Sequence, residues 1–197
     1  MIEGEEQDQS NGYDAVADEF IRARLSGNVG ELEVRTWSRQ LPPSGSVLDL
    51  GCGNGVPVSQ CLIEEGFEVF GIDASPRMVE EYRQRFPHSR IACENALSSS
   101  FFDRTFDGVV AWGLLFLLPA DAQVELIHKM GAIVKSGGRV LFTAPSQVCT
   151  WADAQTGLLS LSLGAVTYRD VLRAAGLALV HELADAGENH YYDSVKL

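Results

Sequence analysis

The sequence predicts an α/β fold in which a doubly wound, mainly parallel sheet has helices on both faces. Three observations lead to this prediction. Short apolar runs alternate with amphipathic runs along the middle of the chain, a rhythm typical of parallel strands joined by helices. A glycine-rich turn at residues 51–55 follows the first apolar run, where an open parallel sheet binds its ligand. The last two apolar runs are joined by too short a connection to be parallel, so they form an antiparallel pair.

Composition and charge limit the class of protein. The chain has 197 residues, 46% of them hydrophobic, which is typical of one globular domain with a sizeable core. The net charge is −12 and the 15 Lys and Arg residues are scattered, so we expect no nucleic-acid partner. No apolar run is long enough for a membrane span, and no leader opens the chain. The four cysteines form no CxxC pair, which indicates a reduced, cytoplasmic protein without a metal site.

The first 44 residues are expected to form a tail followed by helices. Residues 1–12 are acidic and nearly without apolar side chains, which is typical of a disordered tail. Two stretches with helical spacing follow, over residues 13–25 and 31–41. We interpret residues 13–44 as a helical lid over the ligand edge, with these side chains toward the ligand: Tyr13, Phe20 and Arg24.

Five strands and a final hairpin make up the predicted sheet. A connection of about twenty residues after the fifth strand is longer than most, and it is either functional or a surface loop. A helix that ends at Gly176 then precedes two strands at 177–184 and 190–197. Their five-residue linker forces an antiparallel pair, so the last strand is reversed. The first five predicted strands are residues 46–50, 68–72, 90–93, 106–112 and 138–143.

The turn "GCGNG" at residues 51–55 has the features of a nucleoside site. Glycine at alternate positions lets a ligand approach the backbone where a Cβ would block it. A dinucleotide-binding turn reads GxGxxG, whereas this one reads GxGxG, and Asp49 lies two residues before it. A buried acid there repels phosphate and attracts an ammonium group. The residues therefore indicate a nucleoside with a cationic amino-acid tail and no phosphate.

Asp73 ends the second strand, near the ~20-residue offset at which a carboxylate takes ribose hydroxyls. The alternative is that Asp73 caps the helix that follows. Ser75 is better placed as the cap, because Pro76 then takes the first helical position. We therefore favour the ribose for Asp73.

At this point the sequence resembles the class I S-adenosylmethionine-dependent methyltransferases, in particular small stand-alone bacterial members. The motifs "VLDLGCGNG", "GIDASPRM", "ENAL", "FDGVVAWG" and "SGGRVLFTAP" carry the resemblance, in this order. It implies a Rossmann-like sheet of seven strands with the last antiparallel, and S-adenosylmethionine as the cofactor. We accordingly divide a single domain, residues 13–197, into the lid, a cofactor-binding core at 45–145, and a substrate-side loop with a helix and hairpin at 146–197.

The resemblance also implies roles for individual residues. Asp49 would hold the methionine amino group, Asp73 the ribose, and Trp112 would face the methionine moiety, although Trp112 can equally be a core residue. Asn95 stands where the family usually has Asp, and it would take the adenine amine without charge assistance, or else be a loop residue. The implied cofactor-binding residues are Asp49, Gly51, Cys52, Gly53, Gly55, Asp73, Ala74, Met78, Asn95, Ala96 and Trp112.

The C-terminal hairpin supplies the first candidate for a general base. The sixth strand is parallel to the others, so the turn after it emerges at the ligand edge. His190 and Tyr191 then point to opposite faces, and we predict that His190 reaches the substrate, because imidazole titrates near neutral pH. Tyr13 and Asp153 are the other candidates, and a purely structural hairpin is the alternative.

The predicted function is methyl transfer from S-adenosylmethionine to a small molecule, because few residues remain for a cap that recognises a macromolecule. The acceptor and its accepting atom are not readable from the sequence. A non-catalytic S-adenosylmethionine-binding module or partner subunit is the alternative. A nicotinamide oxidoreductase is less favoured, because the GxGxG spacing speaks against it. We expect a monomer or homodimer.

Overall fold

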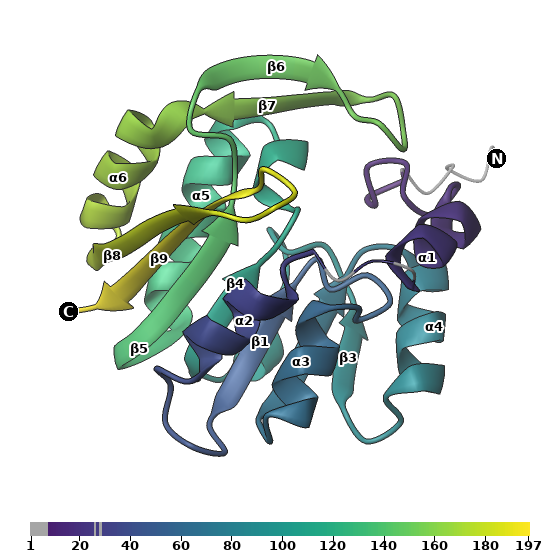
Figure 1. Cartoon of the computed structure of the whole chain (residues 1–197), viewed down its shortest axis with the longest axis horizontal. Coiled ribbons are helices and arrows are strands. Elements are labelled where there is room, and N and C mark those ends of the chain that lie inside the picture. Colours follow the sequence, from purple (N-terminus) through teal and green to yellow (C-terminus); the bar gives the residue numbers. More distant parts are fainter. Residues whose placement is uncertain (1–7, 26, 28) are drawn as a thin grey trace, which may run out of the picture.

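A seven-stranded sheet forms the centre of the computed structural model, which describes residues 8–25, 27 and 29–197 (Figure 1). Its strand order is β3-β2-β1-β4-β5-β9-β8, and only β9 runs antiparallel to its neighbours. The order reverses direction between β1 and β4, which creates the switch point where such sheets bind ligands. The strands are β1 (Ser46–Leu50), β2 (Glu68–Asp73), β3 (Arg90–Cys93), β4 (Phe106–Ala111), β5 (Val134–Thr143), β8 (Leu177–Ala184) and β9 (His190–Lys196).

The predicted fold class is confirmed, with seven strands and the last one reversed. β5 begins at Val134, four residues earlier than predicted, because α5 runs directly into it. Val134 pairs with Phe106 and the pairing then shifts register before Gly108. Gly137, which precedes the predicted strand at 138–143, therefore lies inside β5.

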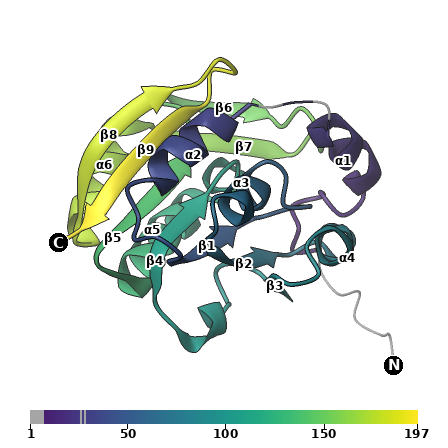
Figure 2. The same ribbon diagram turned by 60° about the horizontal axis from the view of Figure 1, so that its bottom comes forward.

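Helices cover both faces of the sheet, and the alternation of strand side chains divides the core accordingly (Figure 2). Leu48 packs in the layer that holds α5 and α6, whereas Val47 packs in the layer that holds α2 and α3. No helix in the described part of the chain has the length and hydropathy needed to cross a membrane. The helices are α1 (Ala17–Leu25), α2 (Glu31–Ser38), α3 (Val58–Glu64), α4 (Pro76–Arg85), α5 (Ala120–Ile133), α6 (Gly164–Ala174), and the 3₁₀ turns η1 (Phe101–Asp103) and η2 (Leu115–Leu117).

The long connection after β5 is a second, two-stranded sheet and not a loop. Strands β6 (Val148–Ala152) and β7 (Leu159–Leu163) pair antiparallel and run across the carboxyl edge of the main sheet (Figure 1). The alternation in β7 is inverted relative to ordinary amphipathicity: Ser160 and Ser162 are buried, while Leu159 is 66% exposed. The buried Ser162 Oγ donates a hydrogen bond to the carbonyl of Pro145 at 2.6 Å, which offsets the cost of burying the hydroxyl. Because of this inversion, the hydrophobic pattern of the sequence does not predict the hairpin.

The N-terminal segment differs from the predicted tail and helix. Residues 1–7 of the predicted tail lie outside the described residues, but residues 8–12 enter a turn. The Asp8 carboxylate accepts hydrogen bonds from the backbone N–H groups of Ser10 (2.8 Å) and Gly12 (2.9 Å), which fixes this turn. The turn continues through residue 16, so α1 starts at Ala17 and not at residue 13. The ordered domain therefore begins before the boundary that composition suggested.

Candidate active site

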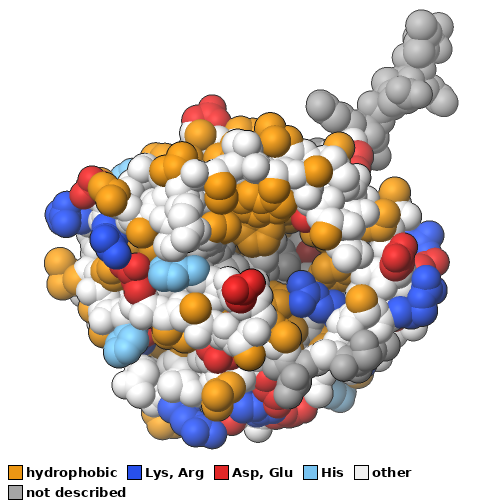
Figure 3. Space-filling view, turned by 45° about the horizontal axis from the view of Figure 1, so that its top comes forward, with side chains coloured by type: hydrophobic (Ala, Val, Ile, Leu, Met, Phe, Trp, Pro, Cys, Tyr) orange, Lys and Arg blue, Asp and Glu red, His pale blue; other side chains and the backbone are white. Residues whose placement is uncertain are grey.

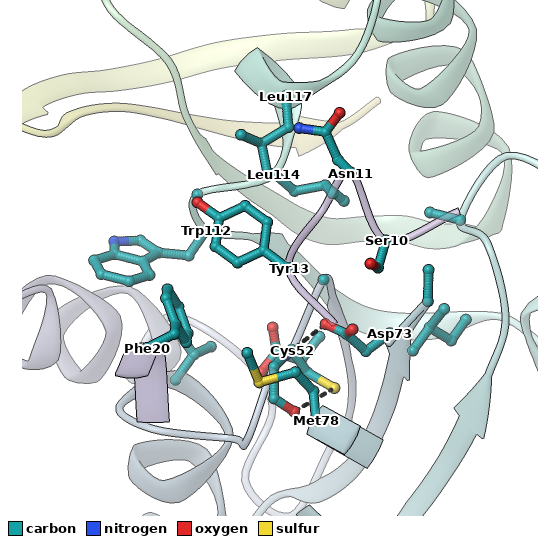
Figure 4. Close-up of a pocket in the computed structure, with 18 of the residues that line it drawn as sticks. Ser10, Asn11, Tyr13, Phe20, Cys52, Asp73, Met78, Trp112, Leu114 and Leu117 are labelled. Carbon is teal, nitrogen blue, oxygen red and sulfur yellow. Dashed lines mark hydrogen bonds between the residues drawn. The ribbon is translucent and has the colours of Figure 1, made fainter. Parts of the chain in front are cut away.

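A cavity of about 420 Å³ opens at the carboxyl edge, between the glycine turn, α1 and the loops below β6–β7. Figure 3 shows hydrophobic side chains gathered beside the hollow on this face, and Figure 4 shows its interior. No group of three or more His, Cys, Asp or Glu side chains suited to a metal occurs among the described residues. All the predicted cofactor residues except Gly55 line the cavity, namely Asp49, Gly51, Cys52, Gly53, Asp73, Ala74, Met78, Asn95, Ala96 and Trp112.

Gly51 and Gly53 form the floor of the cavity in left-handed backbone conformations, with φ of 68° and 54°. A Cβ on Gly53 would point toward Phe20 of the lid, 3.6 Å away, and so into the cavity. A Cβ on Gly51 would lie 3.1 Å from the side chain of Leu114, which forms the opposite wall. The absence of a side chain on Gly53 keeps its backbone accessible to a ligand, whereas on Gly51 it permits the close packing of Leu114.

Gly55 has a different role from the one predicted. It is buried and does not line the cavity. A Cβ at this position would lie 2.4 Å from Cε2 of Phe86 and 2.9 Å from the ring of Tyr82, at the end of α4. These two rings pack edge to face, with centroids 5.1 Å apart. The third glycine therefore permits close packing of α4 beneath the turn and is corrected from a cofactor-binding residue to a packing residue.

Asp73 is held rigidly at the end of β2, in the lower part of Figure 4. Its Oδ2 accepts from the backbone N–H of Gly53 at 2.7 Å, and its Oδ1 accepts from that of Ser75 at 2.9 Å. Ser75 itself caps α4 by accepting from Met78 N at 3.1 Å, as the sequence favoured. Burial raises the pKa of Asp73. Each carboxylate oxygen keeps unused acceptor capacity, which suits two neighbouring hydroxyls of a ligand.

Asp49 lies at the end of β1 and is almost fully buried. Its Oδ2 accepts from the hydroxyl of Ser59 at 2.7 Å, and it forms no ion pair among the described residues. Burial, together with the nearby charge of Asp73, raises the pKa of Asp49 to about 7. A cationic ligand group beside it would restore its charged form.

Arg24 from the lid also lines the cavity, and it forms no ion pair among the described residues. Its guanidinium stacks 4.3 Å from the ring centroid of Trp112 and 4.8 Å from that of Phe20. Burial lowers the pKa of Arg24, and the described part of the chain gives it no carboxylate partner. Trp112 is fixed from behind, because its Nε1 donates to the hydroxyl of Tyr191 at 2.7 Å.

The C-terminal hairpin reaches the cavity wall through Tyr191 and not through His190. The two side chains point to opposite faces, as predicted, but Tyr191 lies on the α2–α3 side and touches Trp112. His190 does not line the cavity: its Nε2 lies 3.2 Å from Glu182, and its ring packs against Tyr192. The structure therefore does not bring the first candidate base to the site, because the register of β9 turns it toward β8.

The other two candidate bases, Tyr13 and Asp153, meet at the upper end of the cavity. The Tyr13 hydroxyl lies 3.2 Å from Oδ2 and 3.3 Å from Oδ1 of Asp153. This contact joins the lid to the turn of the β6–β7 hairpin. Burial, together with the charge of Asp153, raises the pKa of Tyr13 strongly. Tyr13 is therefore a hydrogen-bond donor here, and the carboxylate is the better proton acceptor.

Asn95 lines the cavity with its amide oxygen already engaged. Its Oδ1 accepts from the backbone N–H of Leu97 at 2.8 Å, in the turn after β3. The amide that was predicted to accept from adenine therefore has one lone pair committed to the backbone. Its neighbour Ala96 also lines the cavity, within reach of the same ligand edge.

Two groups of cavity residues escaped the sequence reasoning. One is the turn at residues 9–11, which appears as part of a polar tail; the Nδ2 of Asn11 is buried there without an acceptor among the described residues. The other is the apolar segment after β4, in "GLLFLLP", whose hydrophobicity is unusual for an exposed loop and was the available signal. The residues of this apolar wall are Leu114, Phe116, Leu117 and Leu118.

Comparison with known proteins agrees with this geometry. The profile of the methyltransferase domain family matches residues 47–138, which run from β1 to the middle of β5. A 2-methyl-6-phytyl-1,4-hydroquinone methyltransferase of Synechocystis is 36% identical over 135 residues, covering 64% of this chain and 40% of the relative. A ribosomal protein L11 methyltransferase of Cupriavidus necator is 32% identical over 108 residues, covering 54% of this chain and 34% of the relative. The chain thus spans less than half the length of these relatives.

A solved structure shows the same fold over nearly the whole chain. The 1,6-didemethyltoxoflavin-N1-methyltransferase of Burkholderia thailandensis, determined with its substrate and S-adenosylhomocysteine, superimposes with a TM-score of 0.71 at 19% identity. The match covers 95% of this chain and 90% of that structure. These matches show that residues 47–138 are similar to the methyltransferase domain family, and that the chain as a whole has the fold of the superimposed methyltransferase.

Proposed function

We propose that this chain transfers a methyl group from S-adenosylmethionine to a small-molecule acceptor bound in the same cavity. One observation carries the proposal: the cavity offers one carboxylate that can bind a diol. It also offers a second carboxylate and a guanidinium, which together can bind a zwitterion. Asp73 is the first, while Asp49 and Arg24 are the oppositely charged pair, neither of them ion-paired among the described residues. A nucleoside with an amino-acid tail would provide a complementary partner for each of these three side chains.

The residues present fit S-adenosylmethionine along its whole length. Asp73 would accept from the ribose hydroxyls, and Met78 and Ala74 would flank the adenine. Asp49 would take the ammonium of the amino-acid tail and Arg24 its carboxylate, at charge-assisted strength. The backbone of Gly53 leaves room for the ligand to approach closely. The sulfonium supplies an activated methyl carbon when the cofactor is bound.

The contribution of the chain itself is positioning and exclusion of water. In-line displacement requires the acceptor atom and the methyl carbon to be aligned at contact distance. Trp112, fixed by Tyr191, forms the wall beside Arg24, and Tyr13 holds the lid onto the hairpin turn. The apolar wall at 114–118 closes the remaining side. These elements would orient the acceptor and keep the cavity dry.

A small-molecule acceptor is favoured over a protein. The named activities of the relatives include both kinds, a hydroquinone and a ribosomal protein. In this chain the candidate acceptor region lies beneath α1 and the β6–β7 hairpin, linked by the contact between Tyr13 and Asp153. An acceptor must fit under this cover, which supports a small ligand.

Titration calorimetry tests the proposed cofactor. We expect S-adenosylmethionine and S-adenosylhomocysteine to bind with micromolar affinity, and NAD and ATP to bind far more weakly, because Asp49 repels phosphate. A preference for NAD would contradict the proposal. Incubation with S-adenosylmethionine and a metabolite extract, followed by mass spectrometry for products that have gained one methyl, then separates an enzyme from a non-catalytic binding module.

The pKa of Asp49 makes cofactor binding depend on pH. In the free protein burial raises this pKa to about 7, and an adjacent ammonium group favours the charged form and lowers it. Binding therefore releases a proton below neutral pH, and affinity for S-adenosylhomocysteine rises with pH, by roughly tenfold between about pH 6 and pH 8. Calorimetry in two buffers of different ionisation enthalpy measures the proton release. Asp49→Asn should bind weakly with a flat profile; an equally flat wild-type profile would remove Asp49 from the ammonium site.

A further inference from the structure

The turn of the β6–β7 hairpin places a carboxylate in the cavity without a counter-charge. Asp153 is only 8% exposed and lines the cavity opposite the glycine floor. No Lys, Arg or His of the described chain pairs with it; its contacts are the Tyr13 hydroxyl, two backbone N–H groups and the hydroxyl of Thr156. A charge held in so sheltered a position is costly unless an opposite charge joins it.

The two oxygens of Asp153 have separate surroundings. Oδ1 shapes the hairpin turn, since it accepts from Gln155 N at 3.0 Å, from Thr156 N at 2.9 Å and from Thr156 Oγ1 at 3.1 Å. Among the described residues, Oδ2 has one hydrogen-bond partner, the Tyr13 hydroxyl at 3.2 Å. The turn thus needs one oxygen as an acceptor but not the negative charge, and the second oxygen keeps free acceptor capacity beside the cavity.

The surroundings of this carboxylate are aromatic and apolar. Phe116 lines the cavity and packs on Trp151 of β6, with ring centroids 5.5 Å apart. The ring of Tyr13 packs edge to face on that of Phe20, with centroids 5.3 Å apart, and both residues line the cavity (Figure 4). Aromatic faces attract cations, and apolar walls accept a hydrocarbon skeleton.

The charges along the cavity favour one kind of acceptor. Among the described side chains that line it, Arg24 is the cation, and the proposed function assigns it to the carboxylate of the cofactor. An anionic acceptor would face Asp153 with no cation left to balance it. We propose that the methyl acceptor is an amine on an apolar skeleton, bound as an ammonium ion by Asp153 and the surrounding aromatic rings. This inference rests on the proposed function.

The group-transfer step balances with these groups alone. The bound ammonium gives one proton to Oδ2 of Asp153, which leaves a neutral amine with its lone pair free. The nitrogen forms a bond to the methyl carbon while the carbon–sulfur bond breaks and its electron pair stays on sulfur. The product is a methylated ammonium ion beside a neutral thioether, and Asp153 returns its proton to solvent on product release.

The test uses the complex of the full chain with S-adenosylhomocysteine and measures binding before turnover. Calorimetry would compare compounds that differ in the polar group. Two are amines, 2-phenylethylamine and cyclohexylmethylamine; the others are an alcohol, 2-phenylethanol, and an acid, phenylacetate. We expect the amines to bind at least tenfold more tightly than the alcohol, and the acid not to bind. With S-adenosylmethionine, the amines that bind should gain one methyl on nitrogen.

Asp153→Asn is the matched variant, because its amide oxygen still accepts from Gln155 and Thr156 while the charge is lost. It should weaken amine binding at least tenfold, with unchanged affinity for S-adenosylhomocysteine; the control Asp170→Asn, on the exposed face of α6, should change neither. Unchanged amine affinity in Asp153→Asn would overturn the proposal. So would equal binding of the alcohol by the wild type, or no amine binding at millimolar concentration to a complex that holds S-adenosylhomocysteine. Failure of S-adenosylhomocysteine itself to bind would instead refute the proposed function.

Discussion

Replacement of Asp73 by alanine is expected to weaken binding of S-adenosylhomocysteine by about 10²–10⁴-fold. Each hydrogen bond from a ribose hydroxyl to this carboxylate contributes roughly 1.5–3 kcal/mol, and two are lost together. The carboxylate is already oriented by Gly53 N and Ser75 N, so none of this free energy is spent on ordering it. Calorimetry on the folded variant measures the change.

A ligand-based control separates ribose binding from support of the glycine turn. Asp73 also fixes Gly53, so the alanine variant can lose affinity merely because the turn moves. The 2′-deoxyribose analogue of S-adenosylhomocysteine resolves this as a double-mutant cycle. The analogue should bind the wild type at least tenfold more weakly than the parent ligand does. The Asp73→Ala variant should bind the analogue and the parent ligand with about equal affinity. If loss of the hydroxyl cost the same affinity in both proteins, Asp73 would act on the turn alone.

The parts of this fold that could be predicted are those in which local chemistry decides the outcome. The turn at 51–55 follows a buried strand, and its glycines adopt left-handed backbone conformations that few other residues tolerate. The short linker at 185–189 excludes a parallel pair whatever the rest of the chain does. Ser75 before Pro76 sets the start of α4. In each case a few neighbouring residues are enough to determine the local structure.

The errors occur where distant segments decide the outcome. His190 and Tyr191 alternate faces, but which face meets the cavity depends on β9 inserting between β5 and β8. Gly55 looks like the other two glycines until Phe86, more than thirty positions later in the sequence, packs against it. The buried Ser162 of β7 has its hydroxyl paired only because the carbonyl of Pro145, seventeen positions earlier, lies within hydrogen-bond distance. Local pattern carries no information about these partners.

The cavity wall shows the same dependence on tertiary contacts. Trp112 ends β4, and the sequence placed it either at the methionine moiety or in the core. Its ring faces Arg24 from the lid, while its Nε1 is held by Tyr191, which in turn donates to Asp185 at 2.7 Å. Two segments far from Trp112 in the chain, the lid and the C-terminal hairpin, therefore fix this side chain. The ring lines the cavity on one side and packs against the core on the other, while its contact with the methionine moiety stays a prediction.

Substitution of Gly55 by alanine is expected to lower the free energy of unfolding by about 2–5 kcal/mol. A left-handed conformation costs an alanine roughly 1–2 kcal/mol, and overpacking against a closed core roughly 1–3 kcal/mol more. Both terms apply here, since φ is 84° and the added Cβ would lie 2.4 Å from Phe86. For a domain of this size the melting temperature should fall by about 4–20 °C, which differential scanning calorimetry measures.

Gly66 provides the matched control for this prediction. It ends α3 with φ of 88°, and no heavy atom lies within 4 Å of a Cβ built there. Gly66→Ala therefore carries the conformational cost without the steric one and should lower the melting temperature by only about 2–8 °C. The difference between the two variants isolates the packing of α4 beneath the turn. Equal losses in both would mean that Phe86 and Tyr82 move aside freely, and that the third glycine is required for its backbone conformation alone.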